Sequence, residues 1–198
     1  MKIKRLPRSF YLRPTLSVAK DLIGKYLIRK TRGHTLIGKI VEVEAYLGDK
    51  DPASHAYRGR TRRNDVMFSA GGHLYVYFTY GMHFCANVVT EKEGTGHAVL
   101  IRAVEPIDGI EVMKQDRSFY SGKLKEYDLT NGPAKLCQAF AIDRKDNGMD
   151  LLGDTIFITE GEKISRSSLR SSSRIGISKA IHHRWRFFLR NNPWVSMS

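Results

Sequence analysis

The sequence predicts an α+β fold: one compact domain with a curved, mainly antiparallel, open-barrel-like β-sheet flanked by short helices. A chain of 198 residues, 41% of them hydrophobic, is long enough to bury one core. Segments that alternate like strands outnumber segments with helical periodicity. No internal repeat or long low-complexity linker separates two cores. We therefore expect a single domain over residues 15–198, preceded by a basic N-terminal arm over residues 1–14.

Helical periodicity appears in three short segments. Residues 15–23 place apolar side chains three and four apart, with Thr15 as a candidate N-cap and Gly24 as a candidate end. The second expected helix covers residues 107–117. The third covers residues 133–141 and begins with Pro133, at the position that helices favour for proline.

Two β-hairpins are expected where strand-like segments flank turn residues. Arg32-Gly33 lies in the turn of the first hairpin, and Tyr80-Gly81-Met82 forms the turn of the second, where Gly81 can supply a positive φ. The paired segments are 26–29 with 36–46, and 74–79 with 83–90. Later strands are expected at 98–104, 155–159 and 186–190. The serine-rich stretch 165–173 is interpreted as an exposed connection before the last strands.

The chain is strongly basic, with a formal net charge of +13 and a pI near 9.9. Positive charge gathers in three stretches without acidic residues: residues 1–14, the polar loop with Arg58, Arg60, Arg62 and Arg63, and residues 163–198. One such run is usually a solvated face, but three in a small domain favour contacts with phosphates. Nucleic acid is the expected partner, and an anionic membrane surface is the weaker alternative because no basic amphipathic helix is visible.

Several classes of protein are excluded by composition. No apolar run approaches the roughly 18 residues of a membrane span, and two cysteines do not make a disulfide-dense secreted scaffold. The basic N-terminus lacks the apolar stretch of a secretory signal. We expect an intracellular protein without a membrane partner, cytoplasmic and nucleoid-associated in a bacterium or nuclear in a eukaryote.

A possible acid–base centre lies in the segment Val41–Tyr46. Alternation along a strand places Glu42, Glu44 and Tyr46 on one face. A carboxylate beside an aromatic ring at a strand end suits a general base, although a single strand glutamate is more often solvent-facing. Arg102 lies in an otherwise apolar segment and needs a carboxylate partner. Spacing alone leaves two interpretations open: a structural ion pair, or a base oriented by its cationic neighbour.

Tyrosines dominate the second hairpin. Tyr75 and Tyr77 share one strand face, whereas Phe78 and Phe84 are expected in the core. Tyr80 at the hairpin tip has little core to enter, so it is expected to project. A projecting aromatic can enter a base stack, and neighbouring tyrosines can enclose an extruded base.

The histidines and cysteines show no spacing typical of a zinc site, and no phosphate-binding or dinucleotide motif is present. Asn131-Gly132-Pro133 with Lys135 suits either a phosphate contact or a plain helix start. No metal and no cofactor are expected.

Several ordered motifs resemble the alkyladenine (3-methyladenine) DNA glycosylase family. They are Val-Glu-Val-Glu-Ala-Tyr-Leu-Gly at 41–48, Leu-Tyr-Val-Tyr-Phe-Thr-Tyr-Gly-Met at 74–82, Leu-Ile-Arg-Ala-Val-Glu-Pro at 100–106, Asn-Gly-Pro-Ala-Lys-Leu-Cys-Gln-Ala at 131–139, Arg-Ile-Gly at 174–176 and Pro-Trp-Val-Ser at 193–196. The resemblance implies a compact curved-sheet domain that acts as a monomer on double-stranded DNA containing damaged purines.

The resemblance also implies residue roles. Glu44 corresponds to the general base that activates water, and Arg102 to the arginine that helps to position that water. The base-binding residues would be Tyr46, His55, Tyr77 and Asn87, and the intercalating residues Tyr80 and Met82. Expected contacts with the DNA backbone are Arg60, Arg62, Arg63, Lys135 and Arg174. His83 stands where the resemblance leads us to expect an aromatic residue.

These roles imply a monofunctional DNA glycosylase of base excision repair. It would flip alkylated or deaminated purines of the 3-methyladenine, 7-methylguanine and hypoxanthine class and hydrolyse the N-glycosidic bond, leaving an abasic site. No lysine is an obvious amine nucleophile beside Glu44. The alternative is a non-catalytic RNA- or tRNA-binding module on a related barrel, which uses the tyrosines and basic runs but gives no role to Glu44 and Arg102.

Overall fold

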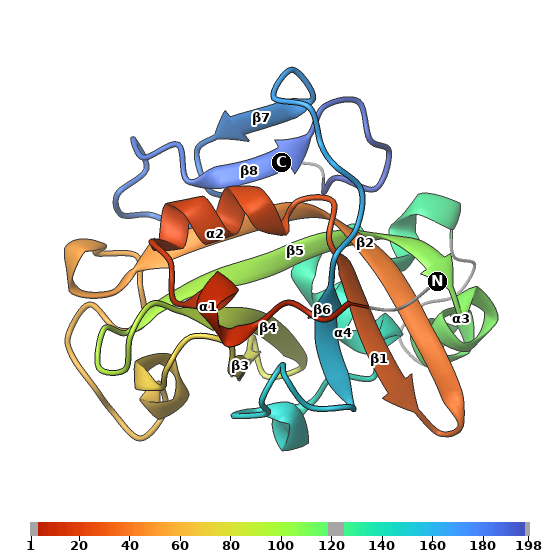
Figure 1. Cartoon of the computed structure of the whole chain (residues 1–198), viewed down its shortest axis with the longest axis horizontal. Coiled ribbons are helices and arrows are strands. Elements are labelled where there is room, and N and C mark those ends of the chain that lie inside the picture. Colours follow the sequence, from red (N-terminus) through yellow and green to blue (C-terminus); the bar gives the residue numbers. More distant parts are fainter. Residues whose placement is uncertain (1–3, 119–124, 197–198) are drawn as a thin grey trace.

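A curled antiparallel sheet organises the chain (Figure 1), shown by a computed structural model that describes residues 4–118 and 125–196. Its eight strands are β1 (Tyr26–Thr31), β2 (His34–Leu47), β3 (Leu74–Thr79), β4 (His83–Thr90), β5 (His97–Asp108), β6 (Ile156–Thr159), β7 (Leu169–Ser172) and β8 (Arg186–Leu189). The main path runs β3-β4-β5-β2-β1-β6, and β8 pairs with both β2 and β7. This architecture confirms the predicted α+β class.

Short helices pack against the sheet. They are α1 (Arg8–Tyr11), α2 (Thr15–Leu22), α3 (Ile110–Ser118) and α4 (Pro133–Ala139). Helix α2 lies across β2 and β5 in Figure 1, whereas α4 packs against β4, β5 and α3. Strand β2 accommodates this packing with Gly38, because a Cβ atom there would lie 2.9 Å from the ring of Phe140. In the described part of the chain, no helix is long and apolar enough to cross a bilayer.

Both predicted hairpins are confirmed. Strands β1 and β2 pair across the Arg32-Gly33 turn, and β3 and β4 pair across the turn at Tyr80-Gly81-Met82. Arg32 and Gly33 have φ values of 48° and 76°, and Tyr80 and Gly81 have φ values of 51° and 69°. Each turn therefore uses two consecutive residues in the left-handed region, only one of which is glycine.

The structure corrects several local predictions. Strand β7 lies within the stretch 165–173 that was interpreted as an exposed connection, because β8 offers it a partner edge. The helix expected from residue 107 begins at Ile110, since β5 continues to Asp108. The helix expected over residues 133–141 ends at Ala139. Pro14 rather than Thr15 is the N-cap of α2, and the Thr15 hydroxyl lies 2.6 Å from Oε1 of Glu91.

The basic segment before residue 15 packs against the domain over its described part, residues 4–14. Leu6 and Tyr11 are buried in the main core, and Arg5 forms an isolated β-bridge with Thr159. The Arg8 guanidinium lies 2.6 Å from the Asp150 carboxylate. Part of the positive charge in this segment is therefore paired within the fold, and residues 1–3 lie outside the described residues.

The long strand β2 positions the functional residues. One edge pairs with β1 up to Lys39 and with β8 from Glu42 to Glu44, while the other edge pairs with β5. The β2–β5 register shifts on both sides of Glu42, which leaves Val41 and Arg102 without partners in that ladder. Such irregularities re-aim side chains, so Arg102 can reach toward the glutamates of β2.

Candidate active site

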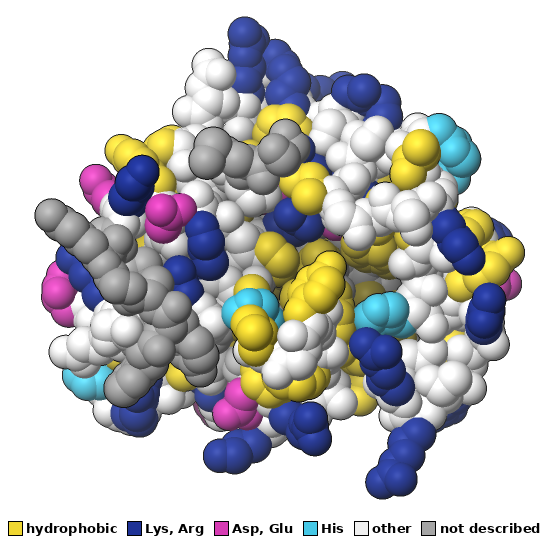
Figure 2. Space-filling model, turned by 180° about the vertical axis from the view of Figure 1, so that it is seen from behind, with side chains coloured by type: hydrophobic (Ala, Val, Ile, Leu, Met, Phe, Trp, Pro, Cys, Tyr) yellow, Lys and Arg dark blue, Asp and Glu magenta, His cyan; other side chains and the backbone are white. Residues whose placement is uncertain are grey.

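An open cavity of about 380 Å³ lies beside the β3–β4 hairpin, within the range typical of small-molecule sites. Seen from behind, the molecule is hollowed near its centre beside a ridge of hydrophobic side chains, with Lys and Arg side chains around this face (Figure 2). The cavity brings together six residues expected from the sequence: Tyr46, His55, Tyr77, Tyr80, Asn87 and Arg102. They come from β2, β3, β4, β5, the β3–β4 turn and the loop after β2.

Glu44 lies directly behind the wall of this cavity. Its carboxylate is fully buried, and its Oε2 accepts a hydrogen bond from the Tyr46 hydroxyl at 2.9 Å. Its Oε1 accepts a hydrogen bond from the backbone N–H of Ile175 at 2.7 Å and lies 3.2 Å from Nη1 of Arg102. Glu44 does not line the cavity itself, but Tyr46, Arg102 and Ile175 all do.

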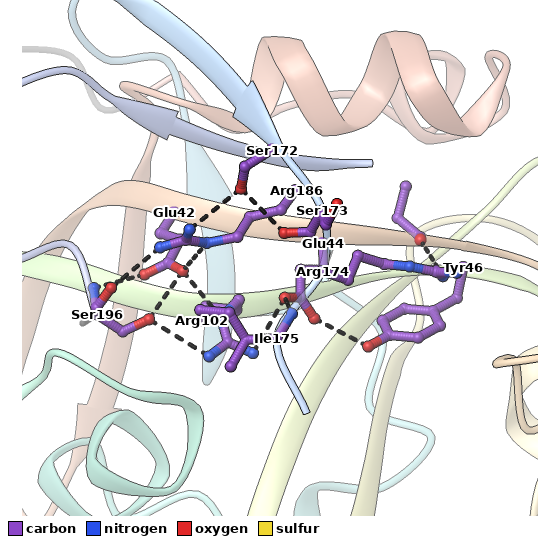
Figure 3. A network of polar contacts seen from close by, with 11 residues as sticks. Glu42, Glu44, Tyr46, Arg102, Ser172, Ser173, Arg174, Ile175, Arg186 and Ser196 are labelled. Atoms are coloured by element: carbon purple, nitrogen blue, oxygen red, sulfur yellow. Dashed lines mark hydrogen bonds and ion pairs between the residues drawn. The ribbon is translucent and has the colours of Figure 1, made fainter. Parts of the chain in front are cut away.

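Arg102 connects the two glutamates of β2. Its Nε donates to Oε1 of Glu42 at 2.9 Å, while its Nη1 faces Glu44 (Figure 3). Burial acts to lower the pKa of Arg102, but the Glu44 and Glu42 carboxylates outweigh it, so the pKa is raised and the guanidinium stays charged. Arg102 is therefore a buried ion-pair partner of both glutamates, and this geometry is compatible with either of the two interpretations that the sequence left open.

Aromatic side chains form one wall of the cavity. The rings of His55 and Tyr77 meet edge to face with their centroids 4.5 Å apart, and the His55 Nδ1 lies 3.1 Å from the Tyr75 hydroxyl. Desolvation and the charge of Arg63 lower the pKa of His55. The imidazole is therefore biased toward its neutral form, which suits a wall that faces a cationic ligand.

Tyr46 is clamped between Glu44 and a second arginine. The guanidinium carbon of Arg174 lies 4.6 Å from the centroid of the Tyr46 ring, in the range of a cation–π contact. Burial and the neighbouring Glu44 raise the pKa of Tyr46. The phenol therefore remains a protonated donor to Glu44 at neutral pH.

The tip of the β3–β4 hairpin is an exposed apolar projection. Tyr80 is 85% exposed and Met82 is 64% exposed, so both side chains project into solvent. Tyr80 has a positive φ, which is unfavourable for a bulky residue. Phe78, which was expected in the core, is 40% exposed, and its ring lies against that of Phe84. Phe84 is half-buried against the core.

The residues expected to contact the DNA backbone differ in their availability. Arg62 and Arg63 are exposed, without an ion-pair partner among the described residues. Arg60 is exposed and pairs with Asp65. Lys135 is half-exposed and contacts Asp128 and Asn131.

Arg174 corrects the prediction of a backbone contact. Its side chain is fully buried and forms two hydrogen bonds with Asp51, at 2.5 Å and 2.8 Å. A third hydrogen bond joins it to the carbonyl of Ala45 at 2.9 Å. With its donors directed inward, Arg174 supports the strand end that carries Tyr46 and has no surface to offer a phosphate.

Sequence reasoning missed several supporting groups. The backbone N–H of Ile175 carries no side-chain signature, although Arg-Ile-Gly was recognised as a motif. Glu42 was noted only as a possible partner of Arg102, yet it also binds Arg186 and Ser196. In the described part of the chain, no cluster of His, Cys, Asp and Glu side chains is suited to a metal ion.

Comparison of the sequence with those of known proteins places this chain in a family. The sequence profile of the family described as "Methylpurine-DNA glycosylase (MPG)" matches residues 9–193. The chain belongs to the methylpurine-DNA glycosylase family. This result makes it a DNA glycosylase, an enzyme of DNA repair, and favours the enzyme over the non-catalytic nucleic-acid-binding module.

Relatives of this methylpurine-DNA glycosylase family member match over nearly the full chain. A protein of Carboxydothermus hydrogenoformans is 54% identical over 192 residues, which cover 96% of this chain and 98% of the relative. A protein of Prosthecochloris aestuarii is 49% identical, covering 97% of this chain and 91% of the relative. Both carry the name "Putative 3-methyladenine DNA glycosylase".

Proposed function

We propose that this protein excises alkylated or deaminated purines from double-stranded DNA. The substrates are of the 3-methyladenine, 7-methylguanine and hypoxanthine class, and the product is an abasic site without strand cleavage. The names of the relatives support 3-methyladenine as one substrate. The proposed enzyme works as a monomer and uses neither a metal nor a cofactor.

The aromatic cavity supports recognition of such bases. A purine alkylated on a ring nitrogen carries positive charge, and the faces of tyrosine rings attract cations. Tyr46 and Tyr77 line the cavity from different strands, with His55 beside Tyr77. Asn87 also lines it, and its Nδ2 donates to the Tyr75 carbonyl at 3.1 Å, which fixes the amide at the wall. This amide is our candidate for discriminating against the exocyclic amine of unmodified guanine, which lacks the positive charge that draws 7-methylguanine into the cavity.

Base flipping is supported by the hairpin at the cavity mouth. Tyr80 both lines the cavity and projects into solvent. A base stacked inside a duplex cannot enter such a cavity, and an inserted side chain can fill the gap that a flipped nucleotide leaves. We propose that Tyr80 and Met82 enter the stack while the damaged base enters the cavity.

Glu44 is the proposed general base, and its contacts are the single observation that carries the mechanism. Three donors hold its carboxylate behind the cavity wall. In the proposed reaction, the bond between C1′ and the purine nitrogen breaks and its electron pair leaves with the base. A water molecule beside Tyr46 and Arg102 attacks C1′ and gives its proton to Glu44, whose negative charge also stabilises the cation-like sugar.

Hydrolysis, rather than an amine-linked lyase reaction, fits the surroundings of Glu44. Among the described residues, the polar contacts of its carboxylate come from Tyr46, Arg102 and Ile175, and none is a lysine. A lyase would need an amine nucleophile that forms a Schiff base. Treatment with borohydride during turnover is therefore expected to trap no covalent adduct between protein and DNA.

The deciding experiment measures release of free base from alkylated duplex DNA by the wild-type protein and Glu44→Gln. We expect Glu44→Gln to bind the duplex as tightly as wild type but to release base at least about 100-fold more slowly. The matched control is Asp146→Asn, which alters another buried carboxylate, paired with Arg29 at 2.6 Å outside the cavity lining. If Glu44→Gln released base at the wild-type rate, Glu44 would not be the general base.

A further inference from the structure

The carboxylate of Glu42 accepts four hydrogen bonds near the site, although Glu42 does not line the cavity. Its Oε1 accepts hydrogen bonds from the Nε of Arg102 at 2.9 Å and the Nε of Arg186 at 2.6 Å. Ser196 adds two more donors: its backbone N–H lies 2.7 Å from Oε2, and its hydroxyl lies 2.8 Å from Oε1 (Figure 3). The side chain of Glu42 is fully buried.

The donors around Glu42 come from distant parts of the chain. Arg186 begins β8 and faces Glu44 across the β2–β8 pair. Its two terminal nitrogens donate to the Ser172 hydroxyl at 3.1 Å and to the Ser196 carbonyl at 3.0 Å. The end of the described chain thus returns to β2 and contacts Glu42 and its two arginines together.

Stability alone is a weak explanation for this arrangement. Ion pairs that are removed from water lose hydration energy comparable to what they gain, and apolar replacements of similar volume are often as stable. The contacts with Glu42 instead fix the orientation of the arginine side chains that bind it. Because Glu42 holds the Nε of Arg102, the Nη1 of the same guanidinium is directed at Glu44.

We propose that Glu42, Arg186 and Ser196 form a positioning network that holds Arg102 against Glu44 and balances the charge around Glu44. The proposal rests on the proposed function of Glu44 and adds residues that act through others rather than on the substrate. Glu42 and Glu44 supply two negative charges, and Arg102 and Arg186 supply two positive ones. Removing one member of this set changes the charge that Glu44 experiences, and the sign of the change depends on which member is removed.

Other groups around Glu44 must be counted in any test that varies pH. The titratable and charged side chains facing it from each packed element are Glu42 and Tyr46 of β2, Cys85 of β4, Arg102 of β5, Arg186 of β8 and Arg174 of the loop before β8. Burial raises the pKa of the Cys85 thiol. Tyr46 and Cys85 therefore stay neutral on the acid side of pH 7, and Arg174 keeps its charge in the pair with Asp51.

The test is the pH dependence of single-turnover base release from alkylated duplex DNA, measured for Glu42→Gln and Arg186→Gln. Glu42→Gln leaves two arginines beside one carboxylate, so the fall in rate on the acid side is expected to move to lower pH. Arg186→Gln removes a positive charge and is expected to move that fall to higher pH. At a separation of two strand residues, each shift is expected to be about one pH unit. The maximal rate of Glu42→Gln is expected to drop at least about tenfold, because Arg102 loses its anchor.

Conservative variants separate charge from shape. Arg186→Lys keeps the positive charge, so the rate of base release is expected to fall on the acid side at the same pH as in the wild type. Ser196→Ala removes one neutral donor and is expected to leave the pH of this fall in rate unchanged. This variant remains informative should Glu42→Gln fail to fold. Asp146→Asn again controls for loss of a buried ion pair, with thermal unfolding measured for every variant.

The outcomes distinguish the two proposals. A wild-type protein that releases no base contradicts the proposed function. If the wild type is active but Glu42→Gln and Arg186→Gln shift the acid fall in the same direction or not at all, the network is only structural and the inference is wrong. The inference would also be wrong if Glu42→Gln and Arg186→Gln lost binding of damaged DNA and rate of base release equally, with no shift in the pH dependence of the rate.

Discussion

The hydroxyl of Tyr46 donates a 2.9 Å hydrogen bond to Oε2 of Glu44, two residues earlier on the same strand. One side chain thus joins the cavity wall to the buried carboxylate behind it. The phenol is held from its other side by Arg174, whose guanidinium faces its ring. In the proposed mechanism, recognition of the base and support of the general base therefore depend on the same tyrosine.

Tyr46→Phe is expected to separate these two roles. The ring remains, so binding of alkylated duplex should change less than about twofold. Loss of a hydrogen bond to the charged form of Glu44 makes that form less favourable. The pH at which the rate of base release drops on the acid side should therefore rise by about one unit. Tyr46→Ala, the comparison variant, should weaken binding as well. Equal weakening of binding by both variants would show that the hydroxyl does not act through Glu44.

The backbone of Tyr80 leads to a second prediction, in which stability and activity move apart. A positive φ is unfavourable for tyrosine by about 1 kcal/mol but readily adopted by asparagine. Tyr80→Asn should therefore unfold at the same or a higher temperature than wild type. Because the wedge is lost, it should bind damaged duplex more weakly and excise more slowly, with a smaller effect on a single-stranded substrate. Similar losses on both substrates would rule out the wedge role.

Local chemistry explains which features the sequence could predict. The hairpins follow from turn residues next to alternating strands, and Arg102 was singled out because a charge in an apolar segment needs a carboxylate. The assignment of Arg174 to the DNA backbone was wrong because its partner, Asp51, lies 123 positions away in the chain. The role of Ile175 depends on a backbone N–H, which residue identity does not reveal.

Strand β7 shows a similar limit. Its serines and arginine have little intrinsic signature of a strand, and pairing with β8 decides its conformation. The same pairing brings Ser172 next to Arg186. Long-range partners of this kind explain why the residues that line the cavity could be predicted from motifs, whereas the contacts of Glu42 with Arg186 and Ser196 could not.

The basic loop leads to a third prediction, about salt dependence. Arg62 and Arg63 are exposed, without ion-pair partners among the described residues, so each can contact a phosphate. The double variant Arg62→Ala, Arg63→Ala should reduce the slope of log K against log salt concentration by about 2. Arg174→Gln should leave that slope unchanged and lower stability, because it breaks a buried ion pair. The opposite pattern would return Arg174 to the phosphate-binding set.

The fourth prediction concerns His55. Desolvation and the positive charge of Arg63 lower its pKa from the usual 6.5. The folded protein therefore holds a neutral imidazole in a pH range where the unfolded chain is already protonated. Because the unfolded state binds more protons there, the free energy of unfolding should fall as pH drops below 6.5, until the folded-state pKa is reached. Above 6.5 His55 should make no such contribution.

Titration of the His55 ring followed by NMR gives a direct measurement of its pKa. His55→Gln should show a weaker fall in the free energy of unfolding across the same pH range. Binding of duplex DNA that carries a cationic base should weaken only once His55 protonates, because two positive charges then meet in the cavity. A His55 midpoint at or above the usual 6.5 would contradict both the neutral wall and its proposed preference for cationic purines.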